Sequence, residues 1–276
     1  MYADLHIHSW YSDGTYSPDE VVQQAINQNM SLISVCDHST FASYPEIEDL
    51  CKANNIKAIL GMEITSVMDD EEYHILAYGF DRQDTALLDL NMYNSDVYAE
   101  MGYGFITKMS ADFPLLSLGE FKQYKRDLTY GGWDSIDYLR YKGLVTDFQN
   151  YVDFARKYAK PPKNDFKHPS EVINTIHNAG GYAVLAHLCH NIKPDTPDYV
   201  KQTKLFTEMG INGFECFYPA FPRDMADYMI KFCRTNNLMI TAGSDDHGHF
   251  IGSPRDQYYI GAVRVGIGDL CLGGMC

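Results

Sequence analysis

Short apolar runs alternate with helical patterns along most of this chain, and that alternation constrains its fold more than any other feature. Such an alternation is typical of βα units built around a largely parallel sheet. The segment Ser17-Pro18-Asp19-Glu20 combines a helix N-cap residue with a proline at the first helical position. The pattern predicts strands at 3–7, 32–36, 58–64, 73–79, 182–186, 213–217 and 238–242, and helices at 18–29, 45–54 and 169–178.

The alternation stops after Asp81, and the segment up to Phe166 shows no strand pattern. It contains charged, tyrosine-rich stretches of helical pattern at 121–126 and 148–158, and Pro161-Pro162 marks a boundary after them. A chain of 276 residues is long enough for one large α/β domain with an insertion. We therefore expect an α/β domain formed by residues 1–83 and 166–276, with a helical insertion at 84–165.

Charge and composition exclude several classes of protein. The formal net charge of -15 opposes unguided binding to long nucleic acids, although metal ions can hold a short nucleotide locally. No stretch approaches the roughly 20 apolar residues of a membrane-spanning helix, and the N-terminus lacks the pattern of a signal peptide. The seven cysteines show no CxxC pairing, which indicates free thiols. These features predict a cytoplasmic protein.

Histidines and carboxylates gather at or beside the ends of the predicted strands. His6 and His8 are two residues apart in a strand, so both side chains face the same side. The strand ends of a parallel α/β fold converge on one crevice, so the nine candidate ligands can meet there. Nitrogen and oxygen donors without thiolates suit zinc, manganese or iron, and nine ligands imply two or three ions bridged by a carboxylate such as Glu63. The nine candidates are His6, His8, Asp13, His38, Glu63, His74, His187, Asp245 and His247.

The motifs around these residues resemble those of the PHP (polymerase and histidinol phosphatase) family. They are DLHIHS, SDGTYSPDEVV, CDHST, GMEI, HILAYGF, AGGYAVLAH and GSDDHG, in this order. Within that family the chain is most similar to small, stand-alone bacterial phosphoesterases that carry a helical insertion. The resemblance implies a distorted seven-stranded (β/α) barrel and a trinuclear site. It assigns His6, His8, Glu63 and Asp245 to one metal, Glu63, His74 and His187 to a second, and Asp13, His38 and His247 to a third.

The resemblance also implies a reaction. Family members release phosphate from nucleoside 3′,5′-bisphosphates, trim short oligonucleotides from the 5′ end, or dephosphorylate histidinol phosphate. A metal-bound water with its pKa lowered to about 7 would be the nucleophile, and the insertion would close over the substrate. Asp37 and Asp246 are candidates for groups that orient the ligand histidines, and Glu215 is a further candidate of this kind. Asp37 and Asp246 are also candidates for the acid that protonates the leaving group.

Two departures from the family pattern concern the substrate. Relatives carry Gly-Arg-Pro-His in the insertion, whereas this chain has Gly131-Gly132-Trp133-Asp134 at the corresponding place. They also follow the barrel histidine with Pro-Gly-Arg, whereas His187 is followed by Leu-Cys-His. His190, Lys193 and Arg255 are the candidates that replace the missing arginines in holding phosphate.

Two other classes of function compete with a nucleotide phosphatase. An amidohydrolase that cleaves C–N bonds also places His-x-His on its first strand, but no lysine here ends a strand where the bridging carboxylated lysine would stand. A non-catalytic, metal-binding structural module is the second alternative. The remaining histidines, His168, His177 and His249, are expected to be surface or capping residues.

Overall fold

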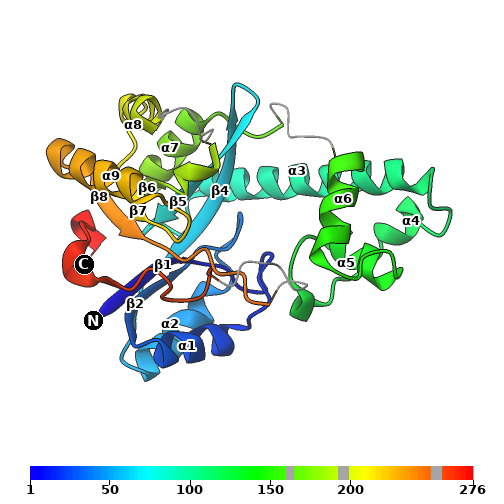
Figure 1. Cartoon of the computed structure of the whole chain (residues 1–276), viewed down its shortest axis with the longest axis horizontal. Helices are drawn as coiled ribbons and strands as arrows, with labels where there is room; N and C mark the ends of the chain where they lie inside the picture. The colour runs from blue at the N-terminus through cyan, green and yellow to red at the C-terminus, as the bar shows by residue number, and fades with distance from the viewer. Residues whose placement is uncertain (160–164, 192–198, 250–256, 276) are drawn as a thin grey trace.

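The computed structural model describes residues 1–159, 165–191, 199–249 and 257–275. These residues form two β-sheets covered by helices on their outer faces, with a lobe of further helices projecting to one side (Figure 1). The sheet order is β3-β2-β1-β9 in the first sheet and β4-β5-β6-β7-β8 in the second. No helix among the described residues is both long and apolar enough to cross a membrane.

The first sheet is built from β1 (Tyr2–Ile7), β2 (Met30–Val35), β3 (Lys57–Ala58) and β9 (Val265–Gly266). The strands β1, β2 and β3 are parallel, whereas β9 runs antiparallel to β1. Helices α1 (Pro18–Asn27) and α2 (Tyr44–Ala53) cover the outer face. The predicted start of α1 is confirmed: Ser17, just before Pro18, forms a reciprocal capping box with Glu20 in the first turn.

The second sheet is mixed, and here the prediction of a largely parallel sheet was wrong. Strand β4 (Gly61–Met68) pairs antiparallel with β5 (Glu71–Tyr78), which pairs antiparallel with β6 (Tyr182–Leu185). Asp69 and Asp70 both have positive φ and form the two-residue turn between β4 and β5, a conformation that Asp tolerates well. The strands β7 (Gly213–Phe217) and β8 (Met239–Ala242) then continue in parallel.

The predicted third strand is in fact two strands in different sheets. Residues 57–58 extend the first sheet, and the chain changes sheet before Gly61. The described parts of the two sheets are joined by isolated bridges, Ile7 with Asp246 and His38 with Glu63. The fold is therefore mixed α/β with two open sheets, and a closed seven-stranded barrel is not confirmed.

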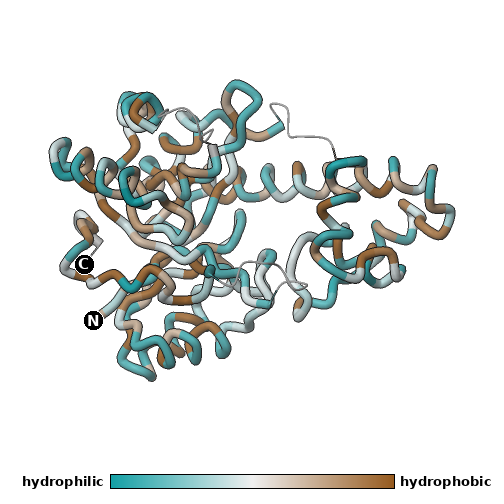
Figure 2. Tube along the Cα trace, in the orientation of Figure 1, coloured by the Kyte–Doolittle hydropathy of each residue, from teal (hydrophilic) through white to brown (hydrophobic). Residues whose placement is uncertain are grey.

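Hydrophobic residues are frequent along the strands and the helices that cover them (Figure 2). Their buried side chains form the core between the sheets and under the helices. Leu5, Tyr78 and Val184 belong to the core between the sheets, where the Tyr78 hydroxyl donates a 2.7 Å hydrogen bond to the carbonyl oxygen of Leu5. Helices α7 (Pro169–Asn178), α8 (Tyr199–Glu208) and α9 (Arg223–Asn236) cover the second sheet. The packing of these helices on the sheets fixes the positions of the strands and of the loops that carry the functional residues.

The lobe consists of α3 (Thr85–Ser110), α4 (Leu118–Phe121), α5 (Asp134–Tyr141) and α6 (Phe148–Tyr158). Helix α3 is about 39 Å long at 1.5 Å per residue. Leu87 and Leu90 in its first half pack into the core of the second sheet, whereas Phe105 and Met109 in its second half pack into the separate core of the lobe. The predicted helix at 148–158 matches α6, but the one at 121–126 was wrong because α4 ends at Phe121.

Candidate metal centre

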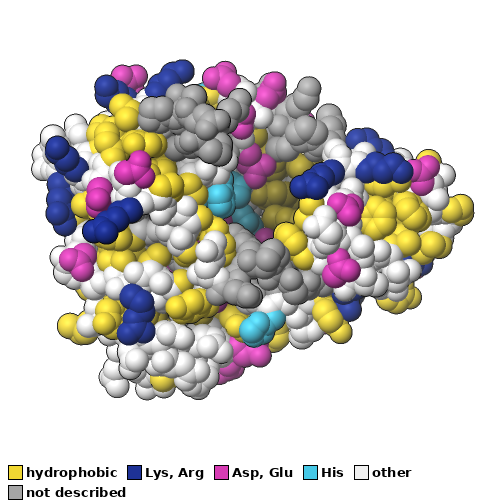
Figure 3. Space-filling model, viewed as in Figure 1, with side chains coloured by type: hydrophobic (Ala, Val, Ile, Leu, Met, Phe, Trp, Pro, Cys, Tyr) yellow, Lys and Arg dark blue, Asp and Glu magenta, His cyan; other side chains and the backbone are white. Residues whose placement is uncertain are grey.

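A group of histidines and carboxylates lies beside the lobe. Most of them follow the ends of strands, as predicted, but Glu63 lies within β4 and His74 lies within β5. Histidine side chains are visible in the hollow between the body of the molecule and the lobe (Figure 3). Strand β1 brings in His6 and places His8 just after its last residue, and both side chains are completely buried. Their Nε2 atoms lie only 3.1 Å apart. Both imidazoles therefore turn a nitrogen toward the same point.

Glu63 lies at the centre of the group. Its Oε2 atom is 3.1 Å from Nε2 of His8, 3.4 Å from Nε2 of His6 and 3.3 Å from Nδ1 of His38. Its Oε1 atom is 2.9 Å from Nδ1 of His74 and 3.0 Å from Nε2 of His187. Each carboxylate oxygen thus faces its own set of imidazole nitrogens. This is the arrangement expected of a carboxylate that bridges two cations.

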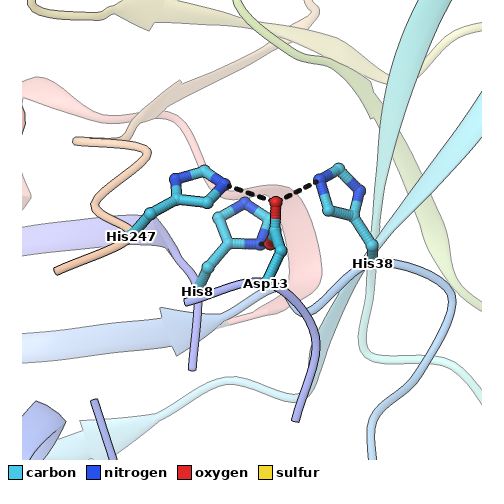
Figure 4. Close-up of side chains that lie close together, drawn as sticks. All are labelled: His8, Asp13, His38 and His247. Atoms are coloured by element: carbon cyan, nitrogen blue, oxygen red, sulfur yellow. Dashed lines mark ion pairs between the residues drawn. The ribbon is translucent and has the colours of Figure 1, made fainter. Parts of the chain in front are cut away.

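Asp13 gathers the histidines at the other end of the group (Figure 4). Its Oδ2 atom lies 3.2 Å from Nε2 of His247 and 3.8 Å from Nε2 of His38, and its Oδ1 atom lies 3.5 Å from Nδ1 of His8. Asp245 occupies the space between the two ends, because its Oδ1 atom is 3.3 Å from Nε2 of His8 and 3.5 Å from Nδ1 of His247.

These contacts divide into three overlapping sets whose donor atoms lie within 4.8 Å of one another. The sets are His8, Asp13, His38 and His247; His6, His8, Glu63 and Asp245; and His38, Glu63 and His74. The second set coincides with the first metal set that the family resemblance implied. The other two differ from the implied sets by the addition of His8 to one and by His38 in place of His187 in the other. His187 still joins the group through its contact with Glu63.

The carboxylates strongly influence the protonation of the buried histidines. Burial alone would lower the pKa of His8, but the carboxylates of Asp245, Glu63 and Asp13 raise it to about 10. Burial likewise would raise the pKa of Glu63, but the surrounding His74, His6 and His38 hold it well below its usual range. For His38 burial dominates, and its pKa falls to about 4. Without cations, protons on His6, His8 and His74 therefore balance the buried negative charge.

Other oxygen atoms fix the orientation of several of these rings. Glu215 in β7 is fully buried: its Oε1 atom is 3.1 Å from Nδ1 of His6, and its Oε2 atom accepts a 2.7 Å hydrogen bond from the backbone N–H of His187. Nδ1 of His247 lies 2.9 Å from the carbonyl oxygen of Asp245. A carboxylate or carbonyl oxygen behind a histidine fixes its tautomer and its direction, which is typical of metal-binding histidines.

Comparison with protein families identifies this architecture. The model of the PHP domain matches residues 4–216. The chain belongs to the PHP domain family.

Relatives of this PHP domain include several hydrolases. It is 27% identical to a 5'-3' exoribonuclease of Haemophilus influenzae, over 88% of this chain and 89% of that protein. It is 26% identical to a phosphoribosyl 1,2-cyclic phosphate 1,2-diphosphodiesterase of Eggerthella lenta, over 91% of this chain and 95% of that protein. The PHP domain described here is accordingly a hydrolase.

Solved structures of similar fold cover nearly the whole chain. A protein of Bifidobacterium adolescentis assigned as a metal-dependent phosphoesterase has a TM-score of 0.74 and 24% identity, over 91% of this chain and 89% of its own. An amidohydrolase of Chromobacterium violaceum has a TM-score of 0.73 and 22% identity, over 91% of this chain and 90% of its own. At these identities both comparisons show a shared fold only. The likeness to the second protein therefore gives no support to cleavage of C–N bonds.

The donor atoms of this PHP domain fit divalent cations. Nδ1 of His38 and Oε2 of Glu63 are buried and form no hydrogen bond within the described part of the chain, although they lie 3.3 Å apart. Buried polar atoms are normally hydrogen-bonded, so atoms of this kind that converge on one point need another partner. Imidazole nitrogens and carboxylate oxygens without thiolates suit zinc, manganese or iron. The clusters could therefore hold metal ions.

The carboxylates of Asp37 and Asp246 do not hydrogen-bond to any of the described histidines. Asp37 instead accepts hydrogen bonds from the backbone N–H of Ser9 and from the hydroxyls of Ser9, Ser12 and Ser43, at 2.6–2.8 Å. The carboxylate of Asp246 accepts from the backbone N–H groups of Gly248 and Ile260. Both residues hold the loops that carry metal-ligand candidates. Neither carboxylate contacts a described histidine ring directly, as a group that orients it would.

Two residues of the site were missed in the sequence. Oε1 of Glu72 lies 2.7 Å from Nε2 of His74, on the side of the ring opposite Glu63. Glu72 and His74 are two residues apart in β5, so the alternation of a strand could have indicated this pair. The hydroxyl of Tyr218 donates a 3.0 Å hydrogen bond to Asp245. Nothing in the sequence around Tyr218 pointed to that contact.

The candidate phosphate-binding residues are only partly placed. His190 is exposed, its ring stacks on that of His187 at 4.5 Å between centroids, and its Nε2 atom lies 3.1 Å from the hydroxyl of Tyr218. His190 is thus beside the cluster. Lys193 and Arg255 lie outside the described residues. Of the other histidines, His168 caps α7 as expected, because its ring accepts a hydrogen bond from the backbone N–H of Ser170.

A cavity of about 570 Å³ opens beside the cluster and extends into the lobe. Asp13, His38 and His74 of the cluster line this cavity, together with Trp133, Tyr98 and other aromatic residues of the lobe. Its volume falls in the range typical of small-molecule sites. The cluster and the lobe therefore share one cavity, large enough for a substrate of nucleotide size.

Proposed function

We propose that this PHP domain is a metal-dependent phosphoesterase that releases phosphate from a small nucleotide. The substrate would be a nucleoside 3′,5′-bisphosphate or the 5′ end of a short oligonucleotide. The observation that carries the proposal is the arrangement of five imidazoles around both oxygens of Glu63, next to a cavity of nucleotide size. Relatives that act on RNA or on a phosphoribosyl cyclic phosphate support phosphoester chemistry on a ribose-containing substrate.

The nine candidate ligands would hold two or three ions of manganese, iron or zinc, with Glu63 shared between neighbouring ions. Bound ions would supply charge to offset that of the phosphate and a water nucleophile active near neutral pH. Glu215 would keep Nε2 of His6 directed at the ion by accepting the proton of Nδ1. Glu72 would do the same for His74.

The helical insertion at 84–165 would act as a lid. Its residues Trp133 and Tyr98 already stand against the cavity, and Arg126 connects it to the loop after β1 through a 3.0 Å hydrogen bond to the carbonyl oxygen of Trp10. Closure over the base and ribose would exclude water from the phosphate. His190, beside His187, would help hold the phosphate.

The decisive experiment measures phosphate release from four compounds, with added Mn²⁺ and again after chelation. The compounds are adenosine 3′,5′-bisphosphate, AMP, a short 5′-phosphorylated oligonucleotide and histidinol phosphate. We expect chelator-sensitive turnover of at least one nucleotide and its loss in Asp245→Asn. Asp224→Asn, an exposed position in α9, is the matched control and should keep full activity.

Other outcomes would separate the alternatives. Turnover of histidinol phosphate alone would identify a histidinol phosphatase. Metal binding without turnover of any phosphoester would contradict the proposal and favour a structural metal-binding module, or a hydrolase of C–N bonds if amide substrates are cleaved. We also propose a cytoplasmic location, because the described cysteines are free thiols, as is usual in a reducing compartment.

A further inference from the structure

The wall of the cavity contains a stacked aromatic pair that the metal chemistry does not use. Trp133 stands at the N-terminus of α5, and Tyr98 comes from the middle of α3. Their rings are stacked, with centroids 4.2 Å apart and planes 22° from parallel. Both residues line the cavity, and Trp133 is partly exposed within it. The lobe thus presents an indole ring directly beside the candidate metal centre.

The rings of Tyr98 and His38 both lie next to this indole. The centroid of His38 lies 5.3 Å from that of Trp133 and 6.3 Å from that of Tyr98. The stacked ring of Tyr98 covers one face of the indole. The plane of the His38 ring is tilted by 36° from that of the indole. Trp133 is partly exposed where it lines the cavity, so these neighbours leave part of its surface accessible.

The indole is also held in place from the backbone side. The N–H of Gly132 donates a 2.6 Å hydrogen bond to the carbonyl oxygen of Asp13, and the guanidinium of Arg126 donates to the carbonyl oxygen of Gly132. Tyr98 is anchored behind the ring by a hydrogen bond between its hydroxyl and that of Thr65. A ring fixed in this way loses little conformational entropy when a ligand stacks on it, which favours binding.

We propose that the exposed surface of the Trp133 indole, where it lines the cavity, is the stacking surface for the nucleobase of the substrate. An aromatic face accepts any base and adds affinity without a hydrogen-bond pattern. The short distance from Trp133 to His38 implies that the stacked base belongs to the same nucleotide as the reacting phosphate. This inference rests on the proposed phosphoesterase function, and it makes Trp133 a residue that determines specificity for nucleotides over phosphates without a base.

The first test compares AMP with ribose 5-phosphate, which differ only in the base. In the Mn²⁺-loaded protein we expect kcat/KM to favour AMP, and Trp133→Ala should reduce that preference by roughly 5- to 150-fold. Trp133→Phe, which retains an aromatic face, should restore most of it. Tyr141→Ala removes an exposed aromatic side chain from the same helix and should leave the preference unchanged. An equal loss for both substrates in Trp133→Ala would overturn the proposal.

The second test needs no turnover. Trp10→Phe leaves Trp133 as the single tryptophan, and its fluorescence should be quenched by AMP but not by ribose 5-phosphate. Equal responses to both compounds, or none, would refute stacking on Trp133. The two proposals fail differently: hydrolysis of both compounds without preference would sustain the phosphoesterase and reject the stacking surface. If AMP quenches the fluorescence of Trp133 but neither AMP nor any other phosphoester is cleaved, the stacking surface would be supported and the phosphoesterase rejected.

Discussion

At the scale of single residues, the buried carboxylates divide into two kinds by the partners they face. Glu63, Asp13 and Asp245 face several imidazole nitrogens at O···N distances of 2.9–3.8 Å. Most of these distances are longer than a good hydrogen bond, as is expected between ligand atoms that surround an ion. Glu215 and Asp37 instead accept hydrogen bonds at 2.6–3.1 Å, mostly from backbone N–H groups and serine hydroxyls. Substitutions of the two kinds should therefore have different effects.

Glu215→Gln should weaken metal binding without unfolding the protein. The amide keeps the shape of the side chain, but it cannot provide a charged acceptor for His6 and also accept from the N–H of His187. Loss of such an orienting carboxylate typically reduces metal affinity about 10- to 100-fold. Competition between the protein and a chelator for Mn²⁺ measures this. Glu208→Gln, an exposed change in α8, is the control, and equal affinities of the two variants would contradict the role of Glu215.

Asp37→Asn should lower stability. Four hydrogen bonds to this buried carboxylate hold Ser9, Ser12 and Ser43 together, and an amide can accept only some of them. We expect the free energy of unfolding to fall by about 2 to 3 kcal/mol, because charged acceptors make the stronger hydrogen bonds. Urea denaturation of Asp37→Asn beside the exposed Asp49→Asn checks this. A change in metal affinity with unaltered stability would instead indicate a role in orienting the ligands.

The candidate ligands could be predicted because each belongs to a local sequence motif, and most of these motifs follow the end of a strand. Glu215 was also predicted, as a group that orients a ligand histidine, and it contacts His6. Tyr218 could not be, since its hydrogen bond to Asp245 depends on two loops 27 residues apart in the chain. The contacts of Asp37 with three serines likewise depend on how the loops after β1 and β2 pack, which spacing does not encode.

At the scale of elements, the strands were easier to predict than their pairing. Seven apolar runs gave seven strand positions, but a run does not state its direction within a sheet. The antiparallel hairpin of β4 and β5 depends on the turn at Asp69 and Asp70, a pair of residues that tolerates positive φ. Strand β9 was missed because two residues carry too little pattern, and it exists through pairing with β1.

The turn at Gly131 and Gly132 joins the lobe to the loop of Asp13, and it permits only a glycine at its first position. Gly131 has φ 64° and ψ -174°, a region essentially restricted to glycine. A Cβ atom there would lie 2.7 Å from Cγ2 of Thr15 and 2.9 Å from the carbonyl oxygen of Asp13. Substitution should therefore disturb both the lobe and a candidate metal ligand.

Gly131→Ala should cost more than Gly143→Ala, which is its matched control. Gly143 also has positive φ, but a Cβ atom there meets no atom within 4 Å. Backbone strain alone should cost Gly143→Ala about 1 to 2 kcal/mol of unfolding free energy. Gly131→Ala should exceed that value and also lower the affinity for Mn²⁺. Urea denaturation and metal titration of both variants measure the difference, and equal effects would show that the contact with the Asp13 loop is unimportant.

At the scale of the whole molecule, the metal centre is the point at which separate layers meet. β1 with its following loops contributes His6, His8 and Asp13, the second sheet contributes Glu63 and His74, and the loop after β8 contributes Asp245 and His247. In the described parts of the chain only isolated bridges join the two sheets at this edge. Cations bound here would therefore connect layers that the backbone connects weakly.

Metal removal should accordingly destabilise the entire fold. Ions that bind the folded state alone stabilise it by RT ln(1 + [L]/Kd), or about 2.7 kcal/mol at a hundredfold excess over Kd. For a chain of this size that corresponds to a rise in melting temperature of about 5 °C. Calorimetry of the chelated protein with and without Mn²⁺ measures the shift. Glu63→Gln removes the carboxylate shared by both sets of nitrogens, so it should abolish most of the shift, whereas Glu208→Gln should retain it. An undiminished shift in Glu63→Gln would mean that the stabilising ion binds elsewhere.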